Sequence, residues 1–159
     1  MIAKAEEFAR EKHAGQYRKP PMEDVPYIEH PKAIVKKLED VGVADDAILS
    51  AAWLHDVVED CNVNLDEIKQ KFGSDIADLV NILTRKRGQD KAEYAQDFYH
   101  ADRRAQLIKV VDVWHNFQCA IKSKEEFREW IDYSTRYFLP LAEKVSPQIY
   151  AELMDMVGT

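Results

Sequence analysis

Apolar residues recur every three to four positions along most of the chain, which is the periodicity of helices that bury one face. The first such segment ends near residues 13–15. A second begins at Pro31, a residue suited to the first turn of a helix, and ends near Gly42. This placement puts His30 at the N-cap of the second helix. The prolines between the two segments predict a loop; they lie at positions 20, 21 and 26.

The same periodicity continues to the end of the chain. Residues 45–60 are apolar nearly all round their middle, which predicts a central buried helix. Asn64 with Glu67 predicts a capped helix that stops at Gly73, and Ser146 predicts the cap of the last helix. The other helices are predicted over about residues 74–84, 91–99, 102–120 and 125–145. No segment alternates as a strand does, so we expect an all-α fold with about eight or nine helices in a single domain over residues 1–159.

Size and charge narrow the classes of function. A chain of 159 residues buries enough surface to fold without disulfides or structural zinc. Cys61 and Cys119 have no CxxC spacing, so we interpret them as reduced thiols of a cytoplasmic protein. The net charge of −7 argues against a nucleic-acid partner, and no apolar run is long enough for a membrane span. If the ligand is anionic, the chain must gather positive charge locally to bind it. A homo-oligomer is possible and is left open.

The end of the central helix carries a dense group of charged residues. His55, Asp56, Glu59 and Asp60 directly follow an apolar run, although charged side chains are rarely buried unless they are paired or bind a metal. On one continuous helix, residues four positions apart share a face, so the carboxylates there repel one another unless a cation is present. Histidine nitrogen with carboxylate oxygen suits manganese, iron, zinc or magnesium, and the lack of thiolates argues against structural zinc.

A plainer interpretation is a solvent-exposed acidic helix end, and for the His-Asp dipeptide alone it is the favoured one. The apolar residues 47–54 shift the balance, because they place the dipeptide near the interior. Two further ligands are available: His30 at a predicted helix start, and Asp112 within an apolar helix. Each also has an ordinary interpretation, His30 as an N-cap and Asp112 as the partner of Lys109.

As a set, these residues follow the order H…HD…D that defines the HD superfamily of metal-dependent phosphohydrolases, which the chain resembles. The resemblance is closer to RelA/SpoT-type alarmone hydrolase domains and extends from about residue 8 to residue 153. It is carried by the segments "FAREKHAGQYRK", "PYIEHP", "AAWLHDVVED", "FGSDIADLVNILTR", "LIKVVDVWHN" and "TRYFLPLAEKV". The synthetase and regulatory regions of the long family members are absent from this sequence. The chain therefore looks like a stand-alone small alarmone hydrolase, similar to metazoan SpoT-like proteins.

The resemblance implies a metal centre and a reaction. It assigns one manganese ion to four ligands and a catalytic role to the pair Glu59 and Asp60; the ligands are His30, His55, Asp56 and Asp112. The family removes pyrophosphate from the 3′ position of ppGpp or pppGpp, which leaves GDP or GTP. A metal that lowers the pKa of bound water, with a carboxylate that orients or deprotonates that water, suits this chemistry. Glu59 is the expected base, and Asp60 the positioning or proton-shuttling partner.

The resemblance also implies substrate contacts. Arg18 and Lys19 match the phosphate-facing "RK" of the family, and Asn116 matches an asparagine that contacts the nucleotide. The basic residues 85–87, with Lys86 at their centre, are a second candidate, although adjacent charges in a loop are more often only solvated. A substrate tyrosine is expected among residues 133–137, with Tyr137 as the candidate. His13 is expected to orient the loop after it, and His115 to be structural.

One position departs from the family pattern, and two rival functions stay open. The family usually reads "KxADRxHN", whereas this chain has Val113 in place of the arginine, so the fit to guanine or adenine alarmones is undecided. The nearest rival is another HD phosphohydrolase that acts on a nucleotide or on NADPH. The second rival is a non-catalytic nucleotide-binding regulator, and the intact Glu59-Asp60 pair argues against it.

Overall fold

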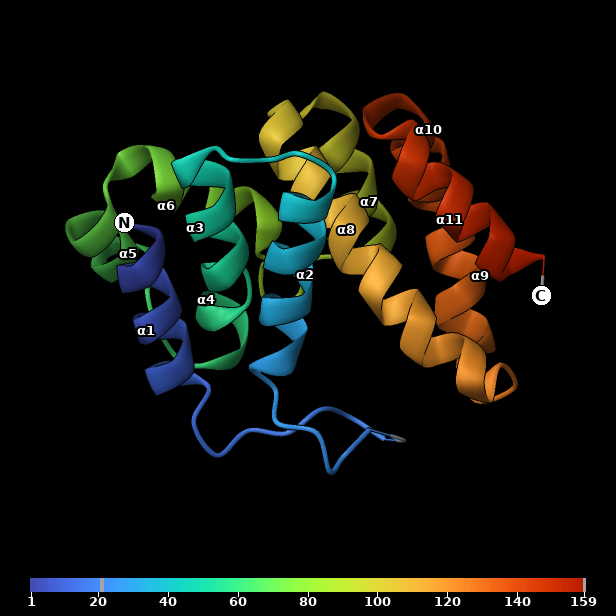
Figure 1. Cartoon of the computed structure of the whole chain (residues 1–159), viewed down its shortest axis with the longest axis horizontal. Helices are drawn as coiled ribbons and strands as arrows, with labels where there is room; N and C mark the ends of the chain where they lie inside the picture. The colour runs from blue at the N-terminus through green and yellow to red at the C-terminus, as the bar shows by residue number, and fades with distance from the viewer. Residues whose placement is uncertain (21, 159) are drawn as a thin grey trace. The chain divides into compact units, whose positions relative to one another are not determined.

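The computed structural model describes residues 1–20 and 22–158; Pro21, one of the prolines expected to form the first loop, lies outside them. Helices make up almost all the regular structure in these residues, and the only β-type pairing among them is one isolated bridge between Tyr17 and Pro26. The predicted all-α class is therefore confirmed (Figure 1). No described helix has both the length and the apolar character that a membrane span requires.

The chain forms two units, Met1–Gln89 and Asp90–Thr159. The first unit contains α1 (Ile2–Lys12), α2 (Glu29–Asp40), α3 (Asp46–Leu54), α4 (Val57–Asp60), α5 (Leu65–Phe72) and α6 (Ser74–Leu83). The second contains α7 (Lys91–Asp97), η1 (Phe98–His100), α8 (Arg103–Ala120), η2 (Ile121–Ser123), α9 (Arg128–Tyr137), α10 (Leu139–Val145) and α11 (Pro147–Val157). The single domain over residues 1–159 stays a prediction.

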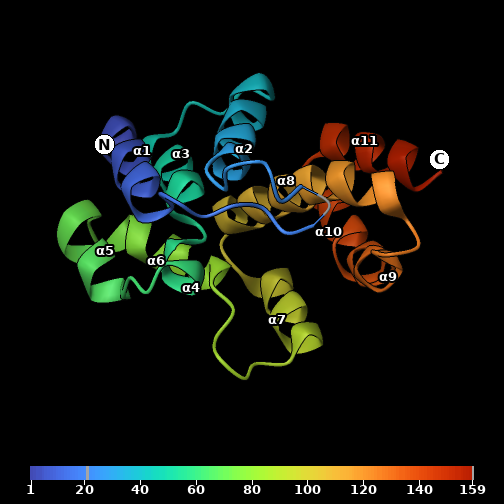
Figure 2. The same ribbon diagram turned by 90° about the horizontal axis from the view of Figure 1, so that it is seen from below.

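Helix α3 is the centre of the first unit. Its N-cap Asp45 accepts a hydrogen bond from the amide of Ile48 at 2.9 Å, which satisfies one of the free amides at the helix start. Every residue from Ile48 to Leu54 is buried. The helix packs against α1, α2 and α6, and both views place α1 and α2 beside it (Figures 1 and 2). Because this helix is anchored on several sides, the residues that follow its last turn are held in place.

The prediction of one continuous helix over residues 45–60 is wrong at His55 and Asp56. Helix α3 ends at Leu54, His55 is its C-cap, and the short α4 begins only after Asp56. The Nδ1 atom of His55 lies 2.7 Å from the carbonyl oxygen of Ala52. In a continuous helix the amide of Asp56 would bond to that carbonyl, so the histidine side chain competes with the backbone at this point. The break means that His55 and Asp56 lie in a turn between two helices.

Two other boundaries also differ from the prediction. The helix expected over residues 125–145 begins at Arg128 and is divided at Phe138 into α9 and α10. Pro140 causes this division, because it has no amide hydrogen and its ring clashes with the preceding helical turn. His30 is not an N-cap: the cap of α2 is Ile28, and His30 lies inside the first turn. The described residues therefore contain more helical segments than the eight or nine predicted.

Helix α8 is the centre of the second unit and packs against α9, α10 and α11. Its buried residues fall on several sides of the helix; they are Ala105, Ile108, Val110, Val111, Asp112, Val113, Phe117 and Ala120. Asp112 is the only charged residue among them, so the structure has to balance its charge within this apolar packing.

Candidate metal and phosphate site

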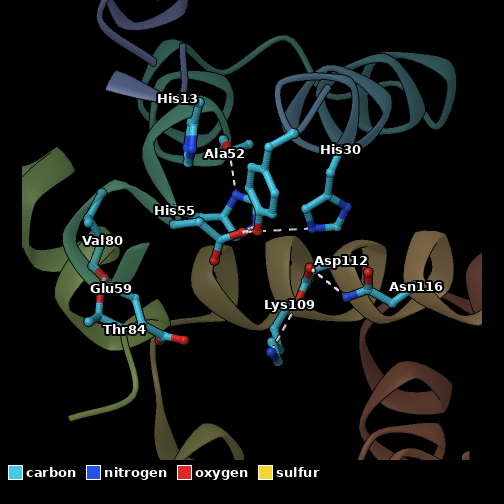
Figure 3. A network of polar contacts seen from close by, with 12 residues as sticks. His13, His30, Ala52, His55, Glu59, Val80, Thr84, Lys109, Asp112 and Asn116 are labelled. Carbon is cyan, nitrogen blue, oxygen red and sulfur yellow. Dashed lines mark hydrogen bonds and ion pairs between the residues drawn. The ribbon is translucent and has the colours of Figure 1, made fainter. Parts of the chain in front are cut away.

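His30, His55 and Asp56 converge in the first unit, and the two histidines are labelled in Figure 3. His30 on α2 is 1% exposed and His55 is 3% exposed, and their ring centroids lie 5.3 Å apart. The Oδ2 atom of Asp56 lies 2.9 Å from Nε2 of His55 and 3.8 Å from Nε2 of His30. The structure thus brings three of the four predicted metal ligands together around one carboxylate oxygen.

The tautomer of His55 shows what this arrangement requires. A carbonyl can only accept, so Nδ1 of His55 donates to Ala52, and in the neutral form of the ring the lone pair is on Nε2. Nε2 faces the Oδ2 atom of Asp56 at 2.9 Å, a contact that is favourable when either a proton or a metal cation is bound to this nitrogen. Metal-binding histidines typically donate their second ring N–H to a carbonyl or carboxylate in this way. The nitrogen and oxygen donors therefore fit a divalent metal ion.

Glu59 is fixed by the chain segment that follows α6. Its Oε1 atom accepts a hydrogen bond from the backbone amide of Arg85 at 2.9 Å. The same segment is tied to α6 by the hydroxyl of Thr84, which donates to the carbonyl of Val80 at 2.8 Å (Figure 3). The first of the basic residues 85–87 therefore contacts the predicted catalytic carboxylate through its backbone amide. A phosphate contact for this loop stays a prediction.

Asp60 has an altered acidity. Loss of surrounding solvent, and then the nearby carboxylates of Asp56 and Glu59, raise its pKa to about 6. Its backbone carbonyl accepts a hydrogen bond from the side-chain amide of Gln16 at 3.1 Å. A carboxyl group with a pKa near neutrality can both give and take a proton, which suits the proton-shuttling role predicted for it.

Arg18 and Lys19 lie in the loop before α2. The bridge at Tyr17 closes this loop, and the amide of Arg18 donates to the carbonyl of Val25 at 2.9 Å. The guanidinium of Arg18 lies over the ring of Tyr27 at 5.5 Å from its centroid, whereas Lys19 is exposed. Arg18 thus has a defined position, while Lys19 extends toward solvent.

Asp112 lies on α8 in the second unit and is 6% exposed. Its Oδ2 atom lies 3.0 Å from the ammonium of Lys109, and its Oδ1 atom accepts a hydrogen bond from Asn116 at 3.2 Å (Figure 3). The pairing with Lys109, which was the ordinary interpretation of Asp112, is therefore present. Lys109 is itself enclosed by aromatic rings at 5.2 to 5.9 Å; these are Tyr94, Phe98 and Phe138.

This pairing predicts a large effect on stability. We expect Lys109→Met to lower the free energy of unfolding by about 2 to 4 kcal/mol, because it leaves the buried Asp112 carboxylate without its cation. Methionine keeps about the same side-chain length among the aromatic rings. The loss of stability would therefore come mainly from the missing charge and less from altered packing. Urea unfolding in the presence of a chelator measures the effect, with the exposed Lys122→Met as the control. Equal stability of the two variants would contradict it.

Two predicted substrate residues have other contacts in the structure. The backbone carbonyl of Tyr137 accepts a hydrogen bond from the hydroxyl of Tyr99, and its neighbour Tyr133 donates to the carbonyl of Lys91 at 2.8 Å. Lys86 is exposed, and its amide donates to the side chain of Gln89 at 3.2 Å. These contacts leave the roles of Tyr137 and Lys86 as predictions.

Sequence reasoning assigned no role to Tyr27 or Gln16, although both lie in the quoted motifs "PYIEHP" and "HAGQYR". In the structure the hydroxyl of Tyr27 donates to Asp56. His13 meets Gln16 at 2.9 Å, which agrees with the expectation that His13 orients its loop. Position within a motif was the only available signal for these residues, since neither spacing nor charge distinguishes them.

Three comparisons with known proteins bear on this site. The HD domain family matches residues 5–146. A Xenopus tropicalis protein named guanosine-3′,5′-bis(diphosphate) 3′-pyrophosphohydrolase MESH1 is 37% identical over 123 residues, which are 74% of this chain and 68% of that protein. The Homo sapiens protein of the same name is 32% identical over 150 residues, which are 91% of this chain and 82% of that protein. These matches confirm the resemblance to alarmone hydrolase domains.

A solved structure supports the fold. A metazoan SpoT ortholog, described as hydrolysing ppGpp, superposes with a TM-score of 0.85 at 24% sequence identity. The match covers 98% of this chain and 92% of that one. At this identity the likeness concerns the arrangement of the helices and leaves the chemistry to the residues themselves.

Proposed function

This chain belongs to the HD domain family, and we propose that it is a metal-dependent hydrolase that removes pyrophosphate from the 3′ position of guanosine alarmones such as ppGpp and pppGpp. One observation carries the proposal: Nε2 of His55 and the carboxylate of Asp56 face each other at 2.9 Å, with Nε2 of His30 at 3.8 Å from the same oxygen. This set of nitrogen and oxygen donors suits a divalent cation, and the two MESH1 proteins similar to the chain bear the name of this activity.

The proposed cofactor is one manganese ion held by His30, His55, Asp56 and Asp112. The first three lie together in the first unit, whereas Asp112 is proposed from its place in the motif order. A bound divalent metal would supply a water of lowered pKa and polarise a phosphoryl oxygen. Donors of this kind also accept iron, zinc or magnesium, so manganese rests on the resemblance to RelA/SpoT-type domains.

The proposed proton carriers are Glu59 and Asp60. Glu59 is held by the amide of Arg85 through Oε1, which leaves its second carboxylate oxygen to take a proton from the attacking water. Asp60, with its pKa raised to about 6, would return a proton to the 3′ oxygen of the ribose as pyrophosphate departs. Asn116 is proposed to contact the nucleotide.

The proposed phosphate-binding residues are needed because the protein and its proposed substrate are both negatively charged. The protein carries a net charge of −7, so its overall field repels a highly anionic nucleotide, and binding depends on the metal and on local cations. Arg18 and Lys19 are the first candidates. Residues 85–87 are the second candidates, since the backbone amide of Arg85 contacts Glu59.

Replacement of the arginines separates these two groups. We expect Arg18→Ala to raise KM strongly and to lower kcat, because a planar guanidinium holds two phosphate oxygens at once and aligns the bond to be broken. Arg87→Ala, which removes an exposed side chain, is expected to have the smaller effect. Steady-state kinetics with ppGpp measures both variants. An Arg18→Ala enzyme with unchanged kcat/KM would place the phosphates elsewhere.

Product analysis tests the proposed function against its rivals. The purified protein is incubated with manganese and, separately, with ppGpp, ppApp and NADPH. Release of pyrophosphate from ppGpp supports the proposal, and release from ppApp extends it to adenine alarmones. Inorganic phosphate from NADPH with no turnover of ppGpp would favour a different HD phosphohydrolase. Binding of ppGpp without any product would favour a regulator.

A further inference from the structure

Tyr27 lies at the meeting point of several groups in the first unit. It lies in the turn directly before Ile28, the N-cap of α2, and three positions before His30. Its amide donates to the carbonyl of Gln16 at 2.9 Å, and this bond adjoins the bridge between Tyr17 and Pro26. These backbone contacts therefore fix the position of the Tyr27 main chain, from which its side chain extends.

The hydroxyl of Tyr27 contacts the proposed metal centre. It donates a hydrogen bond to the Oδ2 atom of Asp56. This is the same oxygen that lies 2.9 Å from Nε2 of His55 and 3.8 Å from Nε2 of His30. A donor on this oxygen fixes the rotation of the carboxylate and neutralises part of its charge. The orientation of Asp56 toward the two histidines thus depends on a group that is not itself a ligand.

The ring of Tyr27 is held by its neighbours. His13 is 2% exposed and stacks on the ring, with centroids 4.7 Å apart and an interplanar angle of 29°. His30 meets the ring edge to face at 5.8 Å. The guanidinium of Arg18 lies 5.5 Å from the ring centroid, within the range of an attractive cation–π contact. One side chain therefore contacts a proposed metal ligand at its tip and a proposed phosphate-binding arginine along its ring.

We propose that Tyr27 is a positioning residue that sets Asp56 for the metal through its hydroxyl and holds Arg18 for the substrate phosphates through its ring. This inference rests on the proposed function, because it takes Asp56 as a ligand and Arg18 as a phosphate contact. It assigns two separate tasks to two parts of one side chain. The tasks are separable by substitution, since phenylalanine removes only the hydroxyl and leucine removes both the hydroxyl and the ring.

The two substitutions have different expected results. Tyr27→Phe should weaken manganese affinity by about 10- to 100-fold, the usual effect of losing a hydrogen bond to a metal ligand. At saturating manganese its KM for ppGpp should stay close to that of the wild type, because the ring beneath Arg18 is retained. Tyr27→Leu should weaken manganese affinity to the same extent and should also raise KM at saturating manganese.

The experiment combines a metal titration with kinetics. Manganese affinity is measured by calorimetry on folded protein in the absence of substrate, and kinetics with ppGpp follow at saturating metal. Tyr17→Phe is the matched control, because Tyr17 lies in the same loop and is 58% exposed. Thermal unfolding in chelator shows whether each variant is folded, and a purely structural role would change that transition without changing manganese affinity.

The outcomes separate this inference from the function beneath it. Unchanged manganese affinity in Tyr27→Phe would overturn the role of the hydroxyl, and this variant decides the point even if Tyr27→Leu does not fold. A Tyr27→Leu enzyme whose KM equals that of Tyr27→Phe would overturn the role of the ring. A wild-type protein that binds manganese but leaves ppGpp intact would contradict the proposed function, while the titration would still judge the link between Tyr27 and Asp56.

Discussion

Glu59→Gln is expected to lower kcat by about 100-fold or more while leaving manganese affinity and substrate binding nearly intact. The amide side chain cannot take a proton from water, yet its oxygen can still accept the hydrogen bond from the amide of Arg85 that orients Glu59. The loop of residues 85–87 should therefore keep its position. Single-turnover kinetics with ppGpp, together with a manganese titration, separates the loss of chemistry from a loss of binding.

The exposed Glu39→Gln serves as the control for this experiment, because it makes the same chemical change at the C-terminal end of α2, whereas His30 lies in the first turn of that helix. Turnover of the control should equal that of the wild type. If Glu59→Gln loses its manganese along with its activity, Glu59 is a metal ligand and the assignment of the base is wrong.

Asp112→Asn is expected to abolish turnover and to reduce bound manganese to below about a tenth of an equivalent. The amide is a far weaker ligand for a divalent metal than a carboxylate. Asparagine keeps the size of the side chain and can still accept the hydrogen bond from Asn116, which limits damage to the packing of α8. Elemental analysis of protein purified without chelator measures the metal directly.

The loss of the Asp112 charge leaves Lys109 without its carboxylate, so folding has to be followed separately. The variant should retain the circular dichroism spectrum of the wild type at the temperature of the assay. Asp132→Asn, an exposed change on α9, is the control and should keep its full manganese content. Full metal content and activity in Asp112→Asn would remove Asp112 from the ligand set.

Local signals in the sequence were enough to predict much of the fold. The cap predicted at Asn64 is confirmed, since its side chain accepts a hydrogen bond from the amide of Glu67 at 2.9 Å. Ser146 caps the last helix by accepting from the amide of Ile149 at 3.3 Å. Gly73 ends α5 with a φ of 92°, a conformation that glycine adopts without strain. Such signals act over a few residues, so spacing alone reveals them.

The break at His55 could not be predicted in the same way. The apolar periodicity continues through Val57, and the interruption depends on a side-chain hydrogen bond to the carbonyl of Ala52. The contact of Glu59 with the amide of Arg85 joins residues far apart in the sequence through a backbone group. Backbone groups are identical at every position except proline, so no pattern of residue types reports such a contact. The motifs therefore indicated candidate site residues but left their mutual geometry undetermined.

Hydrolysis of ppGpp in water labelled with oxygen-18 tests the central claim most directly. The proposed reaction has water attack the phosphorus that is bonded to the 3′ oxygen, so the bond between that phosphorus and the 3′ oxygen breaks. Mass spectrometry of the products should then find one labelled oxygen in pyrophosphate and none in GDP, only with manganese present and not with Glu59→Gln. Labelled inorganic phosphate, formed by attack at the terminal phosphorus, would contradict the proposed 3′-pyrophosphohydrolase.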